Sequence, residues 1–125
     1  MNSEQAVRNV ALIRLVVGVG AYLFPRLAGR LFGLDSVGNP QSPYLARLFG
    51  IRDIALAIGA LQTSGEAQRT WVQVGVLCDV ADTGAALMGQ RAGYLTTPTA
   101  VMVAIPAVTA TALGVQGLQA PSSSA

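Results

Sequence analysis

The C-terminal part of the chain carries no charged side chain, and this feature constrains the fold more than any motif does. Residues 92–125 contain no Asp, Glu, Lys or Arg, and residues 98–118 form an apolar run within them. At a rise of about 1.5 Å per residue, such a run crosses the hydrocarbon core of a bilayer, which is about 30 Å thick. It therefore meets the ordinary criterion for a membrane-spanning helix.

The composition of the whole chain supports the same interpretation. Of its 125 residues, 52% are hydrophobic and 11% are charged, whereas soluble domains carry about 25% charged residues. The chain therefore has too few charges to cover a water-facing surface. Its length predicts a single domain over residues 1–125, because chains usually divide into domains only beyond about 250 residues.

Three further apolar segments precede the uncharged one. Together they predict an all-α fold, a bundle of four transmembrane helices with short loops, whose spans cover about 7–24, 44–62, 70–90 and 98–118. In the first connection, residues 26–32 are expected to form an interfacial helix with its arginines toward lipid headgroups. Residues 119–125, which end in PSSSA, are expected to be a disordered tail.

A soluble four-helix bundle is the structural alternative, because ionisable residues interrupt the first three segments. Outside residues 92–125, no run without a charge is longer than that of residues 54–65, and residues 15–25 form a slightly shorter one. Helices of a soluble bundle need a charged outer face, and none of these segments has one. The pattern therefore favours the membrane interpretation.

The ionisable residues recur on faces that otherwise consist of small residues. In the third segment these are Gly75, Asp79, Asp82, Ala86 and Gly89, at spacings of 4, 3, 4 and 3, so both carboxylates share one helix face. Asp53 lies in a similar stripe of the second segment, and Arg14 in one of the first. Small-residue stripes are typical of membrane helices that pack closely and hide polar groups from lipid.

These stripes predict one buried polar cluster. Arg14, Asp53 and Asp79 lie at similar depths in their spans, and a lone charge there costs about 2.5–3.5 kcal/mol. Charge-assisted hydrogen bonds offset much of this cost. We expect such bonds within one cluster of two arginines and three aspartates, which contains one carboxylate more than the arginines balance. Its members are Arg14, Arg52, Asp53, Asp79 and Asp82. Arg47, nearer the end of its span, either reaches the interface or joins the cluster.

The cluster has two interpretations. It is a structural clasp that fixes helix register, or it serves a function as an anchor for a lipophilic ligand, a proton relay or an acid catalyst. The favoured role is a non-catalytic accessory or scaffold subunit with a membrane protein partner or a second copy. One alternative is an enzyme acting by acid catalysis on a lipophilic small molecule, with Asp79 or Asp82 as proton donor and Arg52 orienting it. The other is a small carrier or proton-coupled transporter.

Missing residue types exclude several chemistries. The chain has no histidine and a single cysteine, Cys78, which leaves no histidine base, no His-ligated metal or haem and no internal disulfide. We therefore expect no cofactor and no metal. The basic residues are scattered, which gives no indication of nucleic-acid binding. All eight are arginines, as is typical of GC-rich genomes, so a bacterial inner membrane is the expected location.

Two segments resemble a known group of proteins. The sequences ALIRLVVGVGAYLFPRLAGRLFG and LARLFGIRDIALAIGAL are similar to small four-helix bacterial membrane proteins of unknown function, broadly the DoxX-like group. The resemblance implies four membrane spans and a shared polar centre that contains the Arg52–Asp53 and Asp79–Asp82 pairs. DoxX-like proteins are associated with quinone-linked or redox accessory roles, which the resemblance extends to this chain as an expectation.

Overall fold

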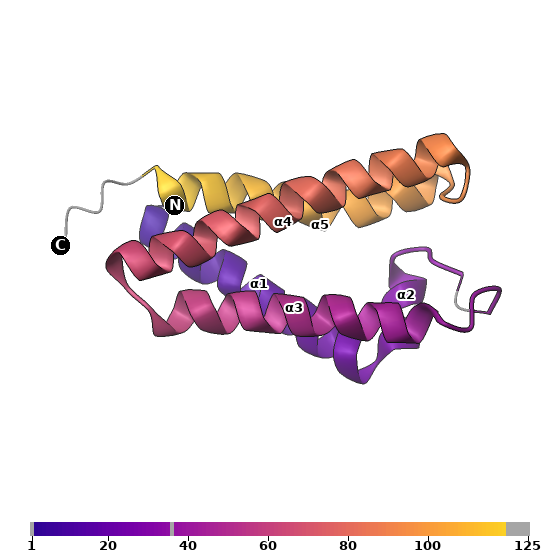
Figure 1. Cartoon of the computed structure of the whole chain (residues 1–125), viewed down its shortest axis with the longest axis horizontal. Coiled ribbons are helices and arrows are strands. Elements are labelled where there is room, and N and C mark those ends of the chain that lie inside the picture. The colour runs from indigo at the N-terminus through magenta and orange to yellow at the C-terminus, as the bar shows by residue number, and fades with distance from the viewer. Residues whose placement is uncertain (1, 36, 120–125) are drawn as a thin grey trace.

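The computed structural model describes residues 2–35 and 37–119, and these residues form helices and short connections without any strand. The all-α prediction is therefore confirmed. The described part of the chain has five helices rather than four (Figure 1): α1 (Ser3–Leu23), α2 (Pro25–Leu31), α3 (Ser42–Gln62), α4 (Gly65–Ala92) and α5 (Thr97–Leu118). The additional helix, α2, has seven residues and occupies the connection where an interfacial helix was expected. The predicted disordered tail lies outside the described residues, except for Gln119.

All four long helices begin earlier than the predicted spans, and α1 and α4 extend furthest beyond the apolar runs. The Asn2 side chain accepts a hydrogen bond from the backbone N–H of Gln5 at 2.8 Å, and the Gln5 side chain accepts one from Asn2 at 3.2 Å. This reciprocal cap starts α1 at Ser3. The α4 helix begins at Gly65 and ends at Ala92, where Gly93 caps it with a φ of +86° that favours glycine.

The four long helices run along one common direction in two antiparallel pairs (Figure 1). The most extensive packing joins α1 to α3 and α4 to α5, and smaller contacts of α1 with α5 and of α3 with α4 close the bundle. The start of α1, the α3–α4 connection and the end of α5 lie at one end, the terminal end. Helix α2 and the α4–α5 connection lie at the opposite end, the α2 end.

Small residues allow the helix backbones to approach closely. A Cβ atom placed on Gly18 of α1 would lie 2.7 Å from the carbonyl oxygen of Gly50 in α3, and one on Gly50 would lie 2.6 Å from that of Gly18. Alanines fill the adjacent core, where Ala11 and Ala57 are almost fully buried. Packing of this kind is typical of membrane helices, whose association depends on close van der Waals contact.

The outer surface of the bundle is apolar. Three helices, α1, α4 and α5, are long and apolar enough to cross a membrane. Many large apolar side chains of these helices point outward, including Val16 and Leu77, which are 74% and 69% exposed. Helix α3 carries three charged residues and is not among the three, although its length is similar. The apolar outer surface and the close helix packing through small residues together support the interpretation that this is a membrane protein.

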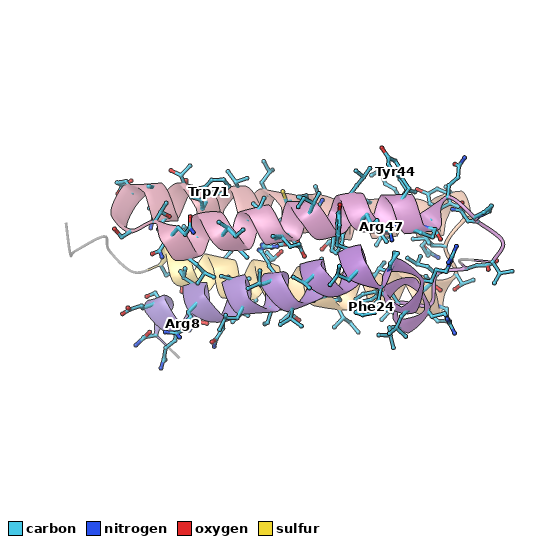
Figure 2. The ribbon with its side chains drawn as sticks, turned by 90° about the horizontal axis from the view of Figure 1, so that it is seen from below. Arg8, Phe24, Tyr44, Arg47 and Trp71 are labelled. Atoms are coloured by element: carbon cyan, nitrogen blue, oxygen red, sulfur yellow. The ribbon has the colours of Figure 1, made fainter. Side chains whose placement is uncertain are left out.

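Aromatic side chains mark both ends of this surface. Figure 2 shows Trp71 at the terminal end, and Phe24 and Tyr44 at the α2 end. Tyr44 is 65% exposed and Trp71 is 37% exposed. Trp and Tyr are enriched where a membrane protein meets the lipid headgroups.

Candidate functional site

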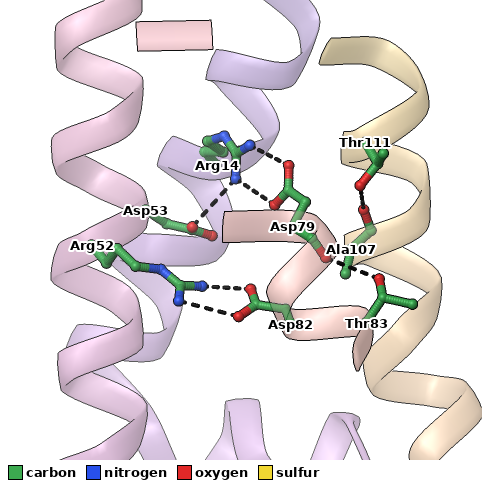
Figure 3. A network of polar contacts seen from close by, with 8 residues as sticks. All are labelled: Arg14, Arg52, Asp53, Asp79, Asp82, Thr83, Ala107 and Thr111. Atoms are coloured by element: carbon green, nitrogen blue, oxygen red, sulfur yellow. Dashed lines mark hydrogen bonds and ion pairs between the residues drawn. The ribbon is translucent and has the colours of Figure 1, made fainter. Parts of the chain in front are cut away.

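Arg14 lies at the centre of the buried charges, between α1, α3 and α4 (Figure 3). Its Nη1 donates a hydrogen bond to Oδ1 of Asp79 at 2.9 Å, and its Nη2 donates a short hydrogen bond to Oδ2 of the same residue. Arg14 is 7% exposed and Asp79 is 3% exposed. The planar guanidinium matches the carboxylate in this bidentate geometry, which is among the strongest polar contacts in proteins.

A second bidentate pair joins α3 to α4 one helical turn toward the α2 end. Nη1 and Nη2 of Arg52 donate to Oδ1 and Oδ2 of Asp82 at 3.2 and 2.6 Å. This pair is only partly buried, because the two side chains are 36% and 30% exposed. The Arg52 guanidinium also lies over the Phe49 ring, 4.9 Å from its centroid, which shields one face of the charge.

Asp53 completes the cluster and is the residue with the weakest partner. Its Oδ1 lies 3.5 Å from Nη1 of Arg14, close enough for an ion pair. Among the described residues, this oxygen accepts no hydrogen bond, although Asp53 is only 5% exposed. The five residues therefore contain one carboxylate more than their guanidiniums balance, and Asp53 is the carboxylate without a bidentate partner.

The structure thus places five of the six predicted site residues together. Arg47 lies apart from them: its Nε donates to the backbone carbonyl of Tyr22 at 3.0 Å, near the end of α1. Figure 2 shows Arg47 toward the α2 end of the bundle. A carbonyl at a helix C-terminus has no partner within its own helix, so Arg47 caps α1 rather than contributing to the cluster.

Hydroxyl groups support the backbone around the cluster. Thr83 Oγ1 donates to the carbonyl of Asp79 at 2.9 Å, and Thr111 Oγ1 donates to that of Ala107 at the same distance (Figure 3). Both threonines bond four residues back along their own helices, which is the usual arrangement of this residue in an apolar helix. The spacing therefore gives no distinctive sequence signal.

The space beside the cluster is too small for a substrate. A cavity lined by Arg14, Trp71 and Gly75, among others, has a volume of about 10 Å³. That is about the smallest volume that holds one water molecule. A larger hollow of about 370 Å³ lies elsewhere, against α5, and none of the five cluster residues lines it. The cluster is therefore closed and mostly paired.

Comparison with family models, with curated proteins and with solved structures gave no match to this chain. The resemblance to DoxX-like proteins rests on the two quoted segments alone and stays a prediction.

Proposed function

We propose that this chain is a multi-pass protein of a bacterial inner membrane, in which α1, α3, α4 and α5 all cross the bilayer. The apolar lengths of α1, α4 and α5 support three of these spans. The fourth span, α3, is supported by the pairing of its central charges, since Arg52 forms an ion pair with Asp82 and Asp53 lies beside Arg14. A paired charge costs far less in hydrocarbon than a lone one, so α3 is compatible with the membrane interior.

The role that the geometry supports best is a non-catalytic accessory or scaffold subunit, with the charged cluster as a clasp between α1, α3 and α4. One observation carries this proposal: both guanidiniums are engaged in bidentate pairs, and the cavity beside them holds about 10 Å³. An acid catalyst acting on a lipophilic substrate needs a carboxyl group that faces a cavity of the substrate's size. A clasp needs only the paired charges.

Asp53 favours a second candidate function. Its Oδ1 is buried and accepts no hydrogen bond among the described residues, so it is a buried acceptor with capacity for another partner, whereas Arg52 Nε is a buried donor without one. In an enzyme or a carrier, this oxygen would be the group that receives a proton or a polar end of a ligand. Opening of the bundle would have to precede either event, because the described structure leaves no path of that size.

The charge distribution supports one orientation. The α2 end carries four arginines and one aspartate: Arg26, Arg30, Arg47, Arg91 and Asp35. The terminal end carries two arginines and two glutamates: Arg8, Arg69, Glu4 and Glu66. Positive charge accumulates on the cytoplasmic side of membrane proteins. We therefore propose that the α2 end faces the cytoplasm and that the terminal end faces the opposite side of the membrane.

Native mass spectrometry of the gently extracted protein tests the role. The clasp proposal predicts a second copy or a stoichiometric protein partner, and no small molecule whose retention depends on the cluster. The variants Asp53→Asn and Asp79→Asn are compared with Asp35→Asn, which lies in the first connection, where its carboxylate accepts hydrogen bonds only from its own turn. A compound that both cluster variants lose and the Asp35→Asn control keeps would establish the second candidate instead.

A further inference from the structure

An apolar groove lies between α1, the end of α2 and α5. It has a volume of about 370 Å³, and it is lined among others by Ile13, Leu31, Phe32, Met102, Ile105 and Pro106. Its lining side chains include several that are strongly exposed, such as Leu31 at 65% and Ile105 at 58%. The groove is therefore open along the outer surface of the bundle, where lipid lies if the chain spans a membrane.

The groove has the depth of one lipid leaflet. Its α5 lining runs from Met102 to Ala110, a rise of about 12 Å at 1.5 Å per residue. Half of a hydrocarbon core measures about 15 Å. At its α2 end, Thr99 of α5 donates a hydrogen bond to the carbonyl of Gly33 at 3.1 Å, which holds α5 beside the residues that follow α2. A hydrocarbon chain entering from the α2 end would thus run toward the bilayer centre.

Two basic residues of α2 precede the residues with which this helix and its end line the groove. Arg26 and Arg30 are exposed and one turn apart on α2, and Leu31 and Phe32, which line the groove, follow them directly. Asp35 is the acidic residue nearest in sequence, and its carboxylate accepts hydrogen bonds from Val37 and Gly38 in its own turn. The arginines therefore keep donors available for an anion at the level of the lipid headgroups.

We propose that the groove between α1, α2 and α5 binds one anionic phospholipid, with an acyl chain along α5 and its phosphate at Arg26 and Arg30. This inference rests on the membrane placement proposed above, but not on the role of the charged cluster. The occupant is an anionic lipid rather than a zwitterionic one, because this end of the molecule carries four arginines and only one aspartate. Cytoplasmic leaflets supply such lipids.

Native mass spectrometry with added lipid tests the site. Phosphatidylglycerol and phosphatidylcholine with identical acyl chains are titrated onto the detergent-solubilised protein, and we expect the anionic lipid to bind more tightly by about fivefold for each arginine. The variant Arg26→Gln/Arg30→Gln should lose most of this preference. Arg91→Gln is the matched control, since it removes an exposed arginine from the same end but away from the groove.

A second pair of variants tests the groove itself. Thr109 lines it and is exposed, whereas Val108, its neighbour in sequence, is 53% exposed and does not line it. Thr109→Phe should weaken binding of both lipids by obstructing the acyl chain, and Val108→Phe should leave binding unchanged. Flotation of each variant with liposomes separates failure of the site from failure of membrane insertion.

Three outcomes would overturn the proposal. They are an equal loss of preference in Arg26→Gln/Arg30→Gln and Arg91→Gln, unchanged binding in Thr109→Phe, and a dimer whose formation displaces the lipid from the groove. The first would show a general surface charge effect, the second a site elsewhere, and the third a protein occupant. If the wild-type chain does not float with liposomes, the membrane placement itself is wrong.

Discussion

Substitution of Arg14 and of Asp79, one at a time, should reveal how much their buried ion pair stabilises the bundle. In Asp79→Leu, Arg14 loses two hydrogen bonds and keeps only the ion pair with Asp53 at 3.5 Å. Removal of one partner of a buried pair costs about 3–5 kcal/mol, and the remaining contact places this variant near 3 kcal/mol. Arg14→Met leaves both carboxylates without their shared cation, so its cost should approach 5 kcal/mol.

The double variant Arg14→Met/Asp79→Leu should be far more stable than the sum of the two losses implies. It leaves no unpaired arginine and only Asp53 without a partner, so we expect a coupling energy of about 2–3 kcal/mol between Arg14 and Asp79. Arg52→Met/Asp82→Leu is the matched cycle. It has the same chemistry, but its side chains are 36% and 30% exposed, and its coupling should be about 1 kcal/mol or less.

Fluorescence of Trp71 provides the assay, because this is the only tryptophan and its ring packs against Gly59 of α3. Its emission therefore reports separation of α3 from α4 during reversible unfolding of the protein in lipid–detergent micelles by increasing SDS. Helical content from circular dichroism confirms that each variant starts from the folded bundle. A coupling energy for Arg14 and Asp79 no larger than that for Arg52 and Asp82 would refute the assignment of the clasp to the buried pair.

Two further predictions concern the bundle and its placement. Gly18→Ala should destabilise the protein by about 1–3 kcal/mol, because the new Cβ meets the Gly50 carbonyl oxygen at 2.7 Å. Gly20→Ala has open space at its Cβ position and should stabilise α1 by about 0.5–1 kcal/mol. The same SDS titration measures both, and equal effects of the two substitutions would contradict the close α1–α3 contact. An alkaline phosphatase reporter fused to the C-terminus should be active outside the cytoplasm, and one fused within the α4–α5 connection should be inactive. The reverse pattern would contradict the proposed orientation.

The helices and their charged faces could be predicted from the sequence because both depend on local periodicity. Apolar runs predicted the positions of the four long helices, of which α1, α4 and α5 are long and apolar enough to cross a bilayer. The recurrence of Gly75 and Asp79 at a helical spacing placed that carboxylate on the packing face, where it is 3% exposed. Charges within such runs are compatible with lipid only when they face other helices, so their approach to one another followed from energetics.

Pairing within the cluster could not be predicted in the same way. Two arginines and three aspartates allow several combinations, and the choice depends on helix rotations and crossing angles that no single segment specifies. In the structure, Arg14 pairs with Asp79 and Arg52 pairs with Asp82, whereas Asp53 forms only a longer ion pair with Arg14. The groove was equally hidden, because it forms only where the end of α2 comes together with residues of α1 and α5 that are distant in sequence.

The environment of Cys78 tests the central claim most directly: the charged cluster is a dry clasp inside the membrane. Cys78 is the only cysteine of the chain and directly precedes Asp79, so a nitroxide attached to it reports the surroundings of the buried pair without any substitution. In liposomes, electron paramagnetic resonance should show relaxation by oxygen, which partitions into lipid, and almost none by a water-soluble nickel chelate. Strong relaxation by the nickel chelate would mean that water reaches the cluster, and this result would contradict the clasp and favour a carrier.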